Sequence, residues 1–158
     1  MKMKIKRVKK TYDEHAEEKI IIHALQRTPG MVAKINQGGR PLMGKDGKVK
    51  KLIPFGNSFY SLPDIFYADK GGVWFFEVKN PNKLKKWAIL ERSNDLEKYL
   101  FEIEVRMRID NPNKKYSDYR QYCFMRDAVK QGLFACYVSY LEDVQNAFNQ
   151  RPSYLWFR

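Results

Sequence analysis

The chain has 158 residues and a formal net charge of +12, with 30 Lys and Arg against 18 Asp and Glu. A hydrophobic fraction of 44% excludes an intrinsically disordered chain, and the length predicts a single domain over residues 1–158 around one core. The excess of positive charge predicts a polyanionic partner. We expect that partner to be nucleic acid, because aromatic residues lie beside several basic segments.

The chain carries no signal for export or for membrane insertion. No apolar run approaches the roughly 20 residues that cross a bilayer, and residues 1–10 alternate basic and apolar residues as a basic arm. We therefore expect a cytoplasmic protein. Cys123 and Cys136 lack a second Cys or His at metal-site spacing, so we expect both to be reduced and buried.

The first predicted element is an amphipathic helix over residues 11–27. One helical stripe combines apolar and acidic residues, namely Glu14, Glu18, Ile21, Ile22 and Leu25. Thr11 is the expected N-cap, with Glu14 completing a capping box. Pro29 and Gly30 end the helix, and residues 31–35 alternate as a short strand does.

A glycine-rich, basic stretch follows over residues 37–58. It holds five glycines and five basic residues, and Lys45-Asp46-Gly47-Lys48 predicts a turn. We expect a mobile basic flap here. Its predicted nucleic-acid contacts are Arg40, Lys45, Lys48, Lys50 and Lys51.

Residues 61–80 predict a β-hairpin, because two runs of aromatic and β-branched residues flank Asp69-Lys70-Gly71-Gly72. A turn centred between Lys70 and Gly71 places Asp64 opposite Glu77, with Lys79 on the same face. Both faces of the hairpin are otherwise apolar. We therefore expect the sheet to be covered on both sides.

Residues 80–116 fit two patterns. Leu96 and Leu100 suit a helix, whereas residues 101–109 alternate as a strand does, and we expect a helix up to about Glu104. The remaining elements are a helix capped by Ser117 or Asp118 and closed by Gly132, a buried strand over 133–139 and a helix over 141–150. The aromatic tail 152–158 is expected to dock on the body.

The predicted chemistry depends on Asp64 and Glu77, which we expect to lie side by side. Two like charges across a β-pair are destabilising, and burying an unpaired charge costs several kcal/mol. A hard divalent cation such as Mg²⁺ removes this conflict, since one or two carboxylates hold it together with waters and phosphate oxygens. With the ammonium of Lys79 nearby, such a centre is typical of phosphodiester hydrolysis.

The sequence Pro63-Asp64, followed by a hairpin and then by Glu77-Val78-Lys79, resembles the motif of the PD-(D/E)XK nuclease superfamily. The predicted order α-β-β-β-α-β matches the core of that superfamily. The resemblance implies an α/β, restriction-endonuclease-like fold with a mixed central sheet flanked by helices. Residues 80–116 then form an insertion between the third strand and the following helix.

Two further positions resemble the VRR-NUC family within that superfamily. They are Gln121, near the start of a helix, and Gly132, before the next strand. On the first helix, Glu18 matches the spacing of an acid in related archaeal Holliday-junction resolvases, and Glu14 is a rival one turn earlier.

The resemblance implies roles for these residues. Asp64, Glu77 and the carbonyl of Val78 would hold Mg²⁺ or Mn²⁺, and Lys79 would position or activate the attacking water. The implied function is a metal-dependent DNA endonuclease, structure-selective for branched or junction DNA. The resemblance also suggests a phage or mobile-element source and a homodimer.

The weaker assignments are Glu18, in an outer metal shell or at a second metal, and Gln121, holding the water or Lys79 in place. Plainer interpretations stay open at this point. The Asp64, Glu77 and Lys79 group can be a cross-strand salt bridge, and Glu18 an exposed helix acid. The alternative function is a non-catalytic nucleic-acid-binding or assembly protein on the same fold, and RNA is an alternative substrate.

Overall fold

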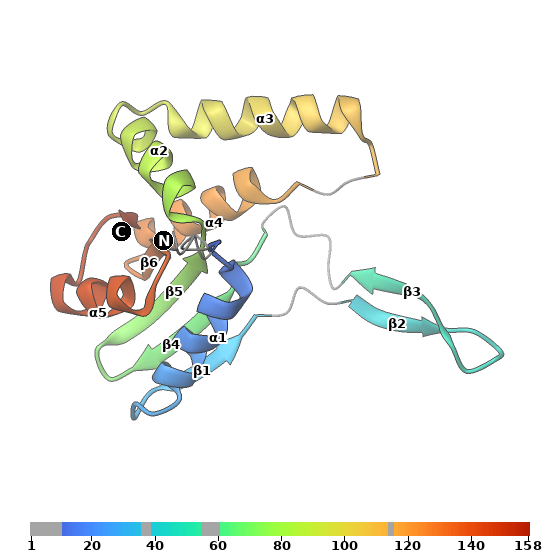
Figure 1. Cartoon of the computed structure of the whole chain (residues 1–158), viewed down its shortest axis with the longest axis horizontal. Helices are drawn as coiled ribbons and strands as arrows, with labels where there is room; N and C mark the ends of the chain where they lie inside the picture. Colours follow the sequence, from blue (N-terminus) through green and yellow to red (C-terminus); the bar gives the residue numbers. More distant parts are fainter. Residues whose placement is uncertain (1–10, 36–38, 55–60, 114–115) are drawn as a thin grey trace, which may run out of the picture.

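The computed structural model describes residues 11–35, 39–54, 61–113 and 116–158. Over these residues the chain is an α/β protein with a five-strand mixed sheet and five helices (Figure 1). The elements are α1 (Glu14–Leu25), β1 (Met31–Lys34), β2 (Gly39–Met43), β3 (Val49–Pro54), β4 (Ile65–Asp69), β5 (Gly72–Val78), α2 (Pro81–Arg92), α3 (Leu96–Asp110), α4 (Asp118–Lys130), β6 (Phe134–Val138), α5 (Leu141–Gln150) and β7 (Trp156–Phe157).

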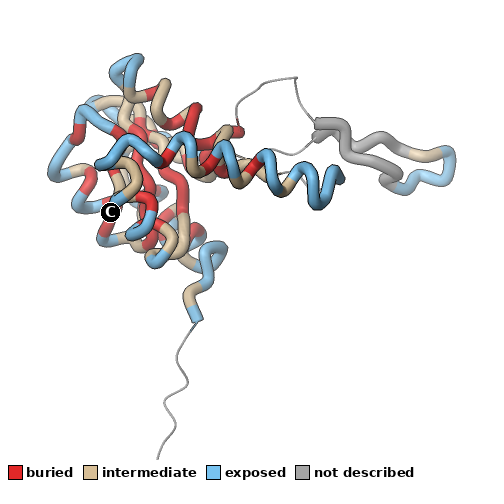
Figure 2. The backbone as a smooth tube through the Cα atoms, turned by 90° about the horizontal axis from the view of Figure 1, so that it is seen from above, coloured by how far each residue is buried: buried red, intermediate tan, exposed pale blue. Residues whose placement is uncertain are grey.

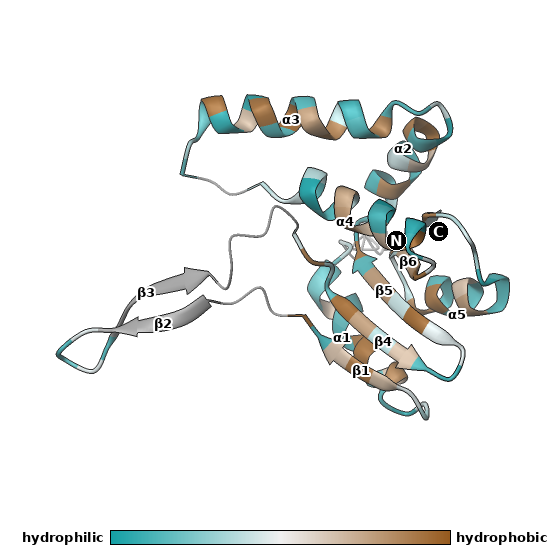
Figure 3. Ribbon diagram, turned by 180° about the vertical axis from the view of Figure 1, so that it is seen from behind, coloured by the Kyte–Doolittle hydropathy of each residue, from teal (hydrophilic) through white to brown (hydrophobic). Residues whose placement is uncertain are grey.

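The central sheet has the strand order β1-β4-β5-β6-β7. Strands β1, β4 and β5 pair in antiparallel fashion, whereas β5, β6 and β7 run parallel to one another. The predicted hairpin register is confirmed, since Ile65 pairs with Phe76 and Phe66 with Phe75. Strands β4 and β5 are hydrophobic along most of their length (Figure 3).

Helices cover both faces of this sheet, as predicted. On one face, α1 and α5 pack on a buried cluster that includes Ile21, Trp74, Phe76 and Val144. On the other face, α2 and α4 pack on β6 around a second buried cluster, and α3 packs on these two helices. The buried residues concentrate in the central sheet and in the helices packed on it (Figure 2). Burial on both faces explains why β4 and β5 carry apolar residues at successive positions.

The first helix begins later than predicted. Its N-cap is Asp13, whose carboxylate accepts hydrogen bonds from the N–H groups of His15 (3.0 Å) and Ala16 (3.2 Å). The prediction of Thr11 as the cap is therefore wrong. Glu14 does not form a capping box, because its Oε1 accepts the N–H of Asn80 at 2.8 Å instead.

Residues 81–110 form two helices, so the strand interpretation is wrong and α3 continues six residues past Glu104 to Asp110. Glu104 itself is buried and accepts hydrogen bonds from Arg108 (2.8 Å) and Arg120 (3.1 Å), which ties α3 to α4. The alternation of apolar residues over 101–109 is typical of a strand, but here Phe101 and Ile109 lie on an exposed stripe of α3. Neither the break between the helices nor its left-handed residue, Asn94 (φ 60°), was predicted.

The last elements follow the prediction closely. Gly132 closes α4 with a φ of +80°, a value that favours glycine, and α5 has the predicted bounds. The aromatic tail docks on the body, and its residues Trp156 and Phe157 add an unpredicted strand beside β6. Cys123 and Cys136 are free and buried, as predicted. None of the helices in the described ranges is long and apolar enough to span a bilayer.

The predicted flap contains a two-stranded sheet of β2 and β3, set apart from the central sheet (Figure 1). Its predicted turn is confirmed, with Gly47 at φ +73° and the N–H of Lys48 donating to Asp46 at 3.2 Å. Lys45 and Lys48 are exposed at the tip. The side chains of the other predicted nucleic-acid contacts, Arg40, Lys50 and Lys51, lie outside the described residues, as does the basic arm 1–10.

Candidate active site

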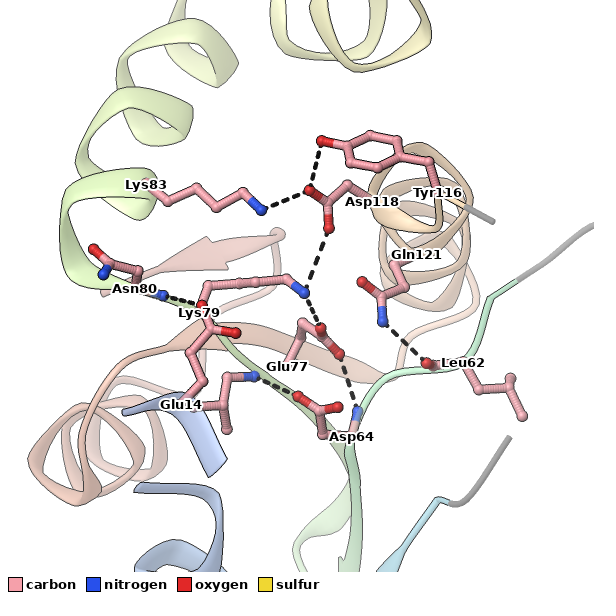
Figure 4. A network of polar contacts seen from close by, with 11 residues as sticks. Glu14, Leu62, Asp64, Glu77, Lys79, Asn80, Lys83, Tyr116, Asp118 and Gln121 are labelled. Atoms are coloured by element: carbon pink, nitrogen blue, oxygen red, sulfur yellow. Dashed lines mark hydrogen bonds and ion pairs between the residues drawn. The ribbon is translucent and has the colours of Figure 1, made fainter. Parts of the chain in front are cut away.

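Two carboxylates meet where β4 begins and β5 ends (Figure 4). Asp64 immediately precedes β4, and Glu77 lies on β5. The N–H of Asp64 donates to Glu77 Oε2 at 3.0 Å, and the N–H of Val78 donates to Asp64 Oδ2 at 3.0 Å. Each acid is thus fixed by the backbone of the neighbouring strand. The structure brings the two predicted acids together.

Burial makes this carboxylate pair unusual. Glu77 is only 1% exposed, and burial raises its pKa from 4.5 to about 8, with the charge of Asp64 adding to the effect while Lys79 opposes it. Burial also raises the pKa of Asp64, while the N–H of Val78 acts in the other direction. Burial therefore disfavours the fully ionised form of the pair, and a proton or a cation stabilises it.

Lys79 bridges two acids. Its Nζ lies 2.5 Å from Glu77 Oε1 and 3.4 Å from Asp118 Oδ1, and little of its side chain is exposed. Burial alone would lower the pKa of Lys79, but the charges of Glu77 and Asp118 raise it above its ordinary value. Lys79 is therefore an ammonium at neutral pH.

Asp118 is a member of this cluster that the sequence analysis treated only as a helix cap. It is buried at the start of α4, and its Oδ2 lies 2.7 Å from Lys83 Nζ and accepts the hydroxyl of Tyr116 at 2.9 Å. Burial opposes its charge, but Lys79 and Lys83 keep its pKa below the ordinary value. One signal was present in the sequence, because Asp118 precedes Gln121 by three positions and shares its face of the helix.

Gln121 approaches the site from the same helix. Its Nε2 donates to the carbonyl of Leu62, two residues before Asp64, at 3.3 Å. Its Oε1 is buried and has no hydrogen-bond partner among the described residues. Gln121 thus anchors the segment that carries Asp64 and leaves one acceptor free beside the cluster (Figure 4).

The two candidate acids of α1, Glu14 and Glu18, are tied to other elements. Glu18 Oε1 lies 2.5 Å from Lys34 Nζ on β1, and Glu14 is bonded to Asn80 at the start of α2. The charge of Glu18 nevertheless contributes to the raised pKa of Asp64. Of the two candidate acids, Glu18 is therefore the one that we associate with the carboxylate pair, because its charge raises the pKa of Asp64.

The residues present fit a hard divalent cation. In the described part of the chain, no three Asp, Glu, His or Cys side chains form a ready ligand set. Asp64 and Glu77 are nevertheless two adjacent oxygen donors whose charged forms burial disfavours, and Mg²⁺ commonly takes one or two carboxylates and completes its shell with water and phosphate oxygens. The carbonyl of Val78 stays a predicted further ligand.

Fold and site together define an α/β protein with a buried centre of acids and lysines at the end of β5. Comparisons with protein-family models, with curated proteins and with solved structures find no match to this chain. The assignment of its chemistry therefore depends on the residues of this centre.

Proposed function

We propose that this protein is a metal-dependent endonuclease that hydrolyses DNA phosphodiester bonds, as its resemblance to the PD-(D/E)XK superfamily and the VRR-NUC family implies. One observation carries the proposal. Asp64 and Glu77 are held side by side where burial disfavours their charged forms, and the ammonium of Lys79 lies 2.5 Å from Glu77. A plain cross-strand salt bridge does not need the second buried acid.

In the proposed mechanism, Asp64, Glu77 and the Val78 carbonyl hold Mg²⁺ or Mn²⁺. When bound, the ion supplies an acidified water and neutralises charge on the phosphoryl oxygens. Lys79 donates hydrogen bonds to the attacking water or to a phosphoryl oxygen, where a fixed ammonium stabilises developing negative charge. The free Oε1 of Gln121 can accept a hydrogen bond from that water and orient it.

The order of the elements supports a restriction-endonuclease-like core. Helix α1, strands β1, β4 and β5, helix α4 and strand β6 follow one another as α-β-β-β-α-β. The hairpin β2–β3 is added between the first two of these strands, and α2 and α3 fill the insertion predicted over residues 80–116.

DNA is the proposed substrate because the chain is strongly basic. The chain carries +12, and Lys45 and Lys48 are exposed at the tip of the β2–β3 turn. Basic surfaces bind phosphate backbones with a strong dependence on salt concentration. Branched or junction DNA remains the proposed preference, on the resemblance alone.

A cleavage assay tests this function. The full chain is incubated with supercoiled plasmid, linear duplex, a four-way junction, single-stranded DNA and RNA, each with Mg²⁺, Mn²⁺ or EDTA. We expect cleavage of DNA that needs the metal and that EDTA abolishes. Metal-dependent cleavage of RNA alone would reassign the substrate, and salt-sensitive binding without any cleavage would favour the non-catalytic alternative.

The raised pKa of Glu77 predicts that metal affinity depends on pH. Below about pH 8 the Glu77 carboxyl keeps a proton that a cation must displace, whereas above it no proton competes. Mn²⁺ affinity should therefore rise about tenfold per pH unit from pH 6 to 7 and level off above about pH 8. Titration followed by electron paramagnetic resonance (EPR) measures this, and the Glu77→Gln variant should bind Mn²⁺ weakly at every pH. A constant affinity from pH 6 to 9 would contradict it.

A further inference from the structure

The ammonium of Lys79 occupies one oxygen of the proposed metal site. Its Nζ lies 2.5 Å from Glu77 Oε1, the oxygen that is not bonded to the Asp64 N–H. A divalent cation bound to Glu77 and Asp64 would repel the ammonium that contacts the same carboxylate. The ammonium must therefore find another acceptor when the ion binds.

Asp118 offers that acceptor. Its Oδ1 is already 3.4 Å from Lys79 Nζ, so a small movement of the lysine side chain changes its main partner. Its other oxygen is held at 2.7 Å by Lys83 and at 2.9 Å by the hydroxyl of Tyr116. These two contacts fix the carboxylate and leave Oδ1 directed at Lys79 (Figure 4).

We propose that Asp118 is a positioning residue that receives the ammonium of Lys79 when a divalent cation occupies Asp64 and Glu77, so that metal binding and placement of the lysine are coupled. This inference rests on the proposed function, because it needs the metal site.

The balance of charge supports the role. When all three acids are ionised, Asp64, Glu77 and Asp118 carry three negative charges against two positive charges on Lys79 and Lys83. A divalent cation changes this total from −1 to +1, and a bound phosphodiester brings it to zero. Without the charge of Asp118 the cluster would be at +2 after metal binding, with a buried ammonium and no acceptor, which is strongly unfavourable.

A double-mutant cycle on Mn²⁺ affinity tests the coupling without relying on cleavage. The four proteins are the natural chain, Asp118→Asn, Lys79→Met and the double variant, titrated with MnCl₂ and followed by EPR. We expect Asp118→Asn to weaken Mn²⁺ binding by about tenfold in the natural background, which corresponds to about 1.4 kcal/mol. In the Lys79→Met background the same substitution should change the affinity by less than about threefold.

Equal losses of Mn²⁺ affinity in both backgrounds would overturn the positioning role of Asp118, since Asp118 would then act by its charge alone and not through Lys79. A chain that binds no Mn²⁺ would overturn the metal site and this role together, whereas binding with no coupling overturns the role alone. Tyr116→Phe is a second variant that leaves every charge in place. It should weaken Mn²⁺ binding by a smaller factor of about two to three, and an unchanged affinity would argue against a fixed Asp118.

Discussion

Replacing either acid of the carboxylate pair is expected to lower the rate of metal-dependent DNA cleavage by at least about a thousandfold, or about 4 kcal/mol of transition-state stabilisation. The variants are Asp64→Asn and Glu77→Gln. A neutral amide is a poor ligand for a hard cation, so the metal and the chemistry it supplies are lost. Nicking of supercoiled plasmid under single-turnover conditions measures the rate.

Both variants should fold, because each amide oxygen can still accept the backbone bond of the acid it replaces. Asn at position 64 keeps an acceptor for the N–H of Val78, and Gln at position 77 keeps one for the N–H of Asp64. Glu102→Gln is the matched control, since the exposed Glu102 side chain lies on α3 and approaches Lys98 at 4.0 Å. Cleavage by both site variants within threefold of the control would refute the assignment.

Lys79→Met is expected to lower the cleavage rate at saturating DNA by about a hundredfold to ten-thousandfold, because it removes the ammonium that orients the water or stabilises the phosphoryl oxygens. Unlike the acid variants, it should still bind Mn²⁺, since it removes a positive charge beside Glu77. Loss of cleavage with retained metal binding is the signature of this role.

Lys130→Met controls for the general loss of a positive charge. Lys130 lies in the last turn of α4, is exposed and approaches Asp127 at 3.5 Å. It should keep the normal rate at saturating DNA. A Lys79→Met variant with the same rate as this control would show that Lys79 is a structural counterion only.

The hairpin and its two acids could be predicted because the information is local. The turn at Asp69-Lys70-Gly71-Gly72 fixes the register of β4 and β5, and the register alone places Asp64 beside Glu77. The same holds for α5, whose apolar residues repeat with a clear helical period. In these elements local propensity and tertiary packing favour the same structure.

Features that depend on contacts far apart in the sequence could not be predicted. Asp118 joins the site because the start of α4 lies beside the end of β5, and no local sequence pattern between residues 80 and 116 predicts this placement. Glu14 is bonded to Asn80, 66 residues away, so Asp13 serves as the cap in place of the predicted pair. The second half of α3 exposes apolar residues, which produced the false strand signal.

A crystal soaked in MnCl₂ at about pH 8, with anomalous diffraction recorded for manganese, tests the central claim most directly. We expect one anomalous peak about 2.1 to 2.2 Å from carboxylate oxygens of both Asp64 and Glu77, with the ammonium of Lys79 moved towards Asp118. The contradicting result is a map with no peak at this position, in which Lys79 still contacts Glu77 and the two acids keep only their backbone bonds.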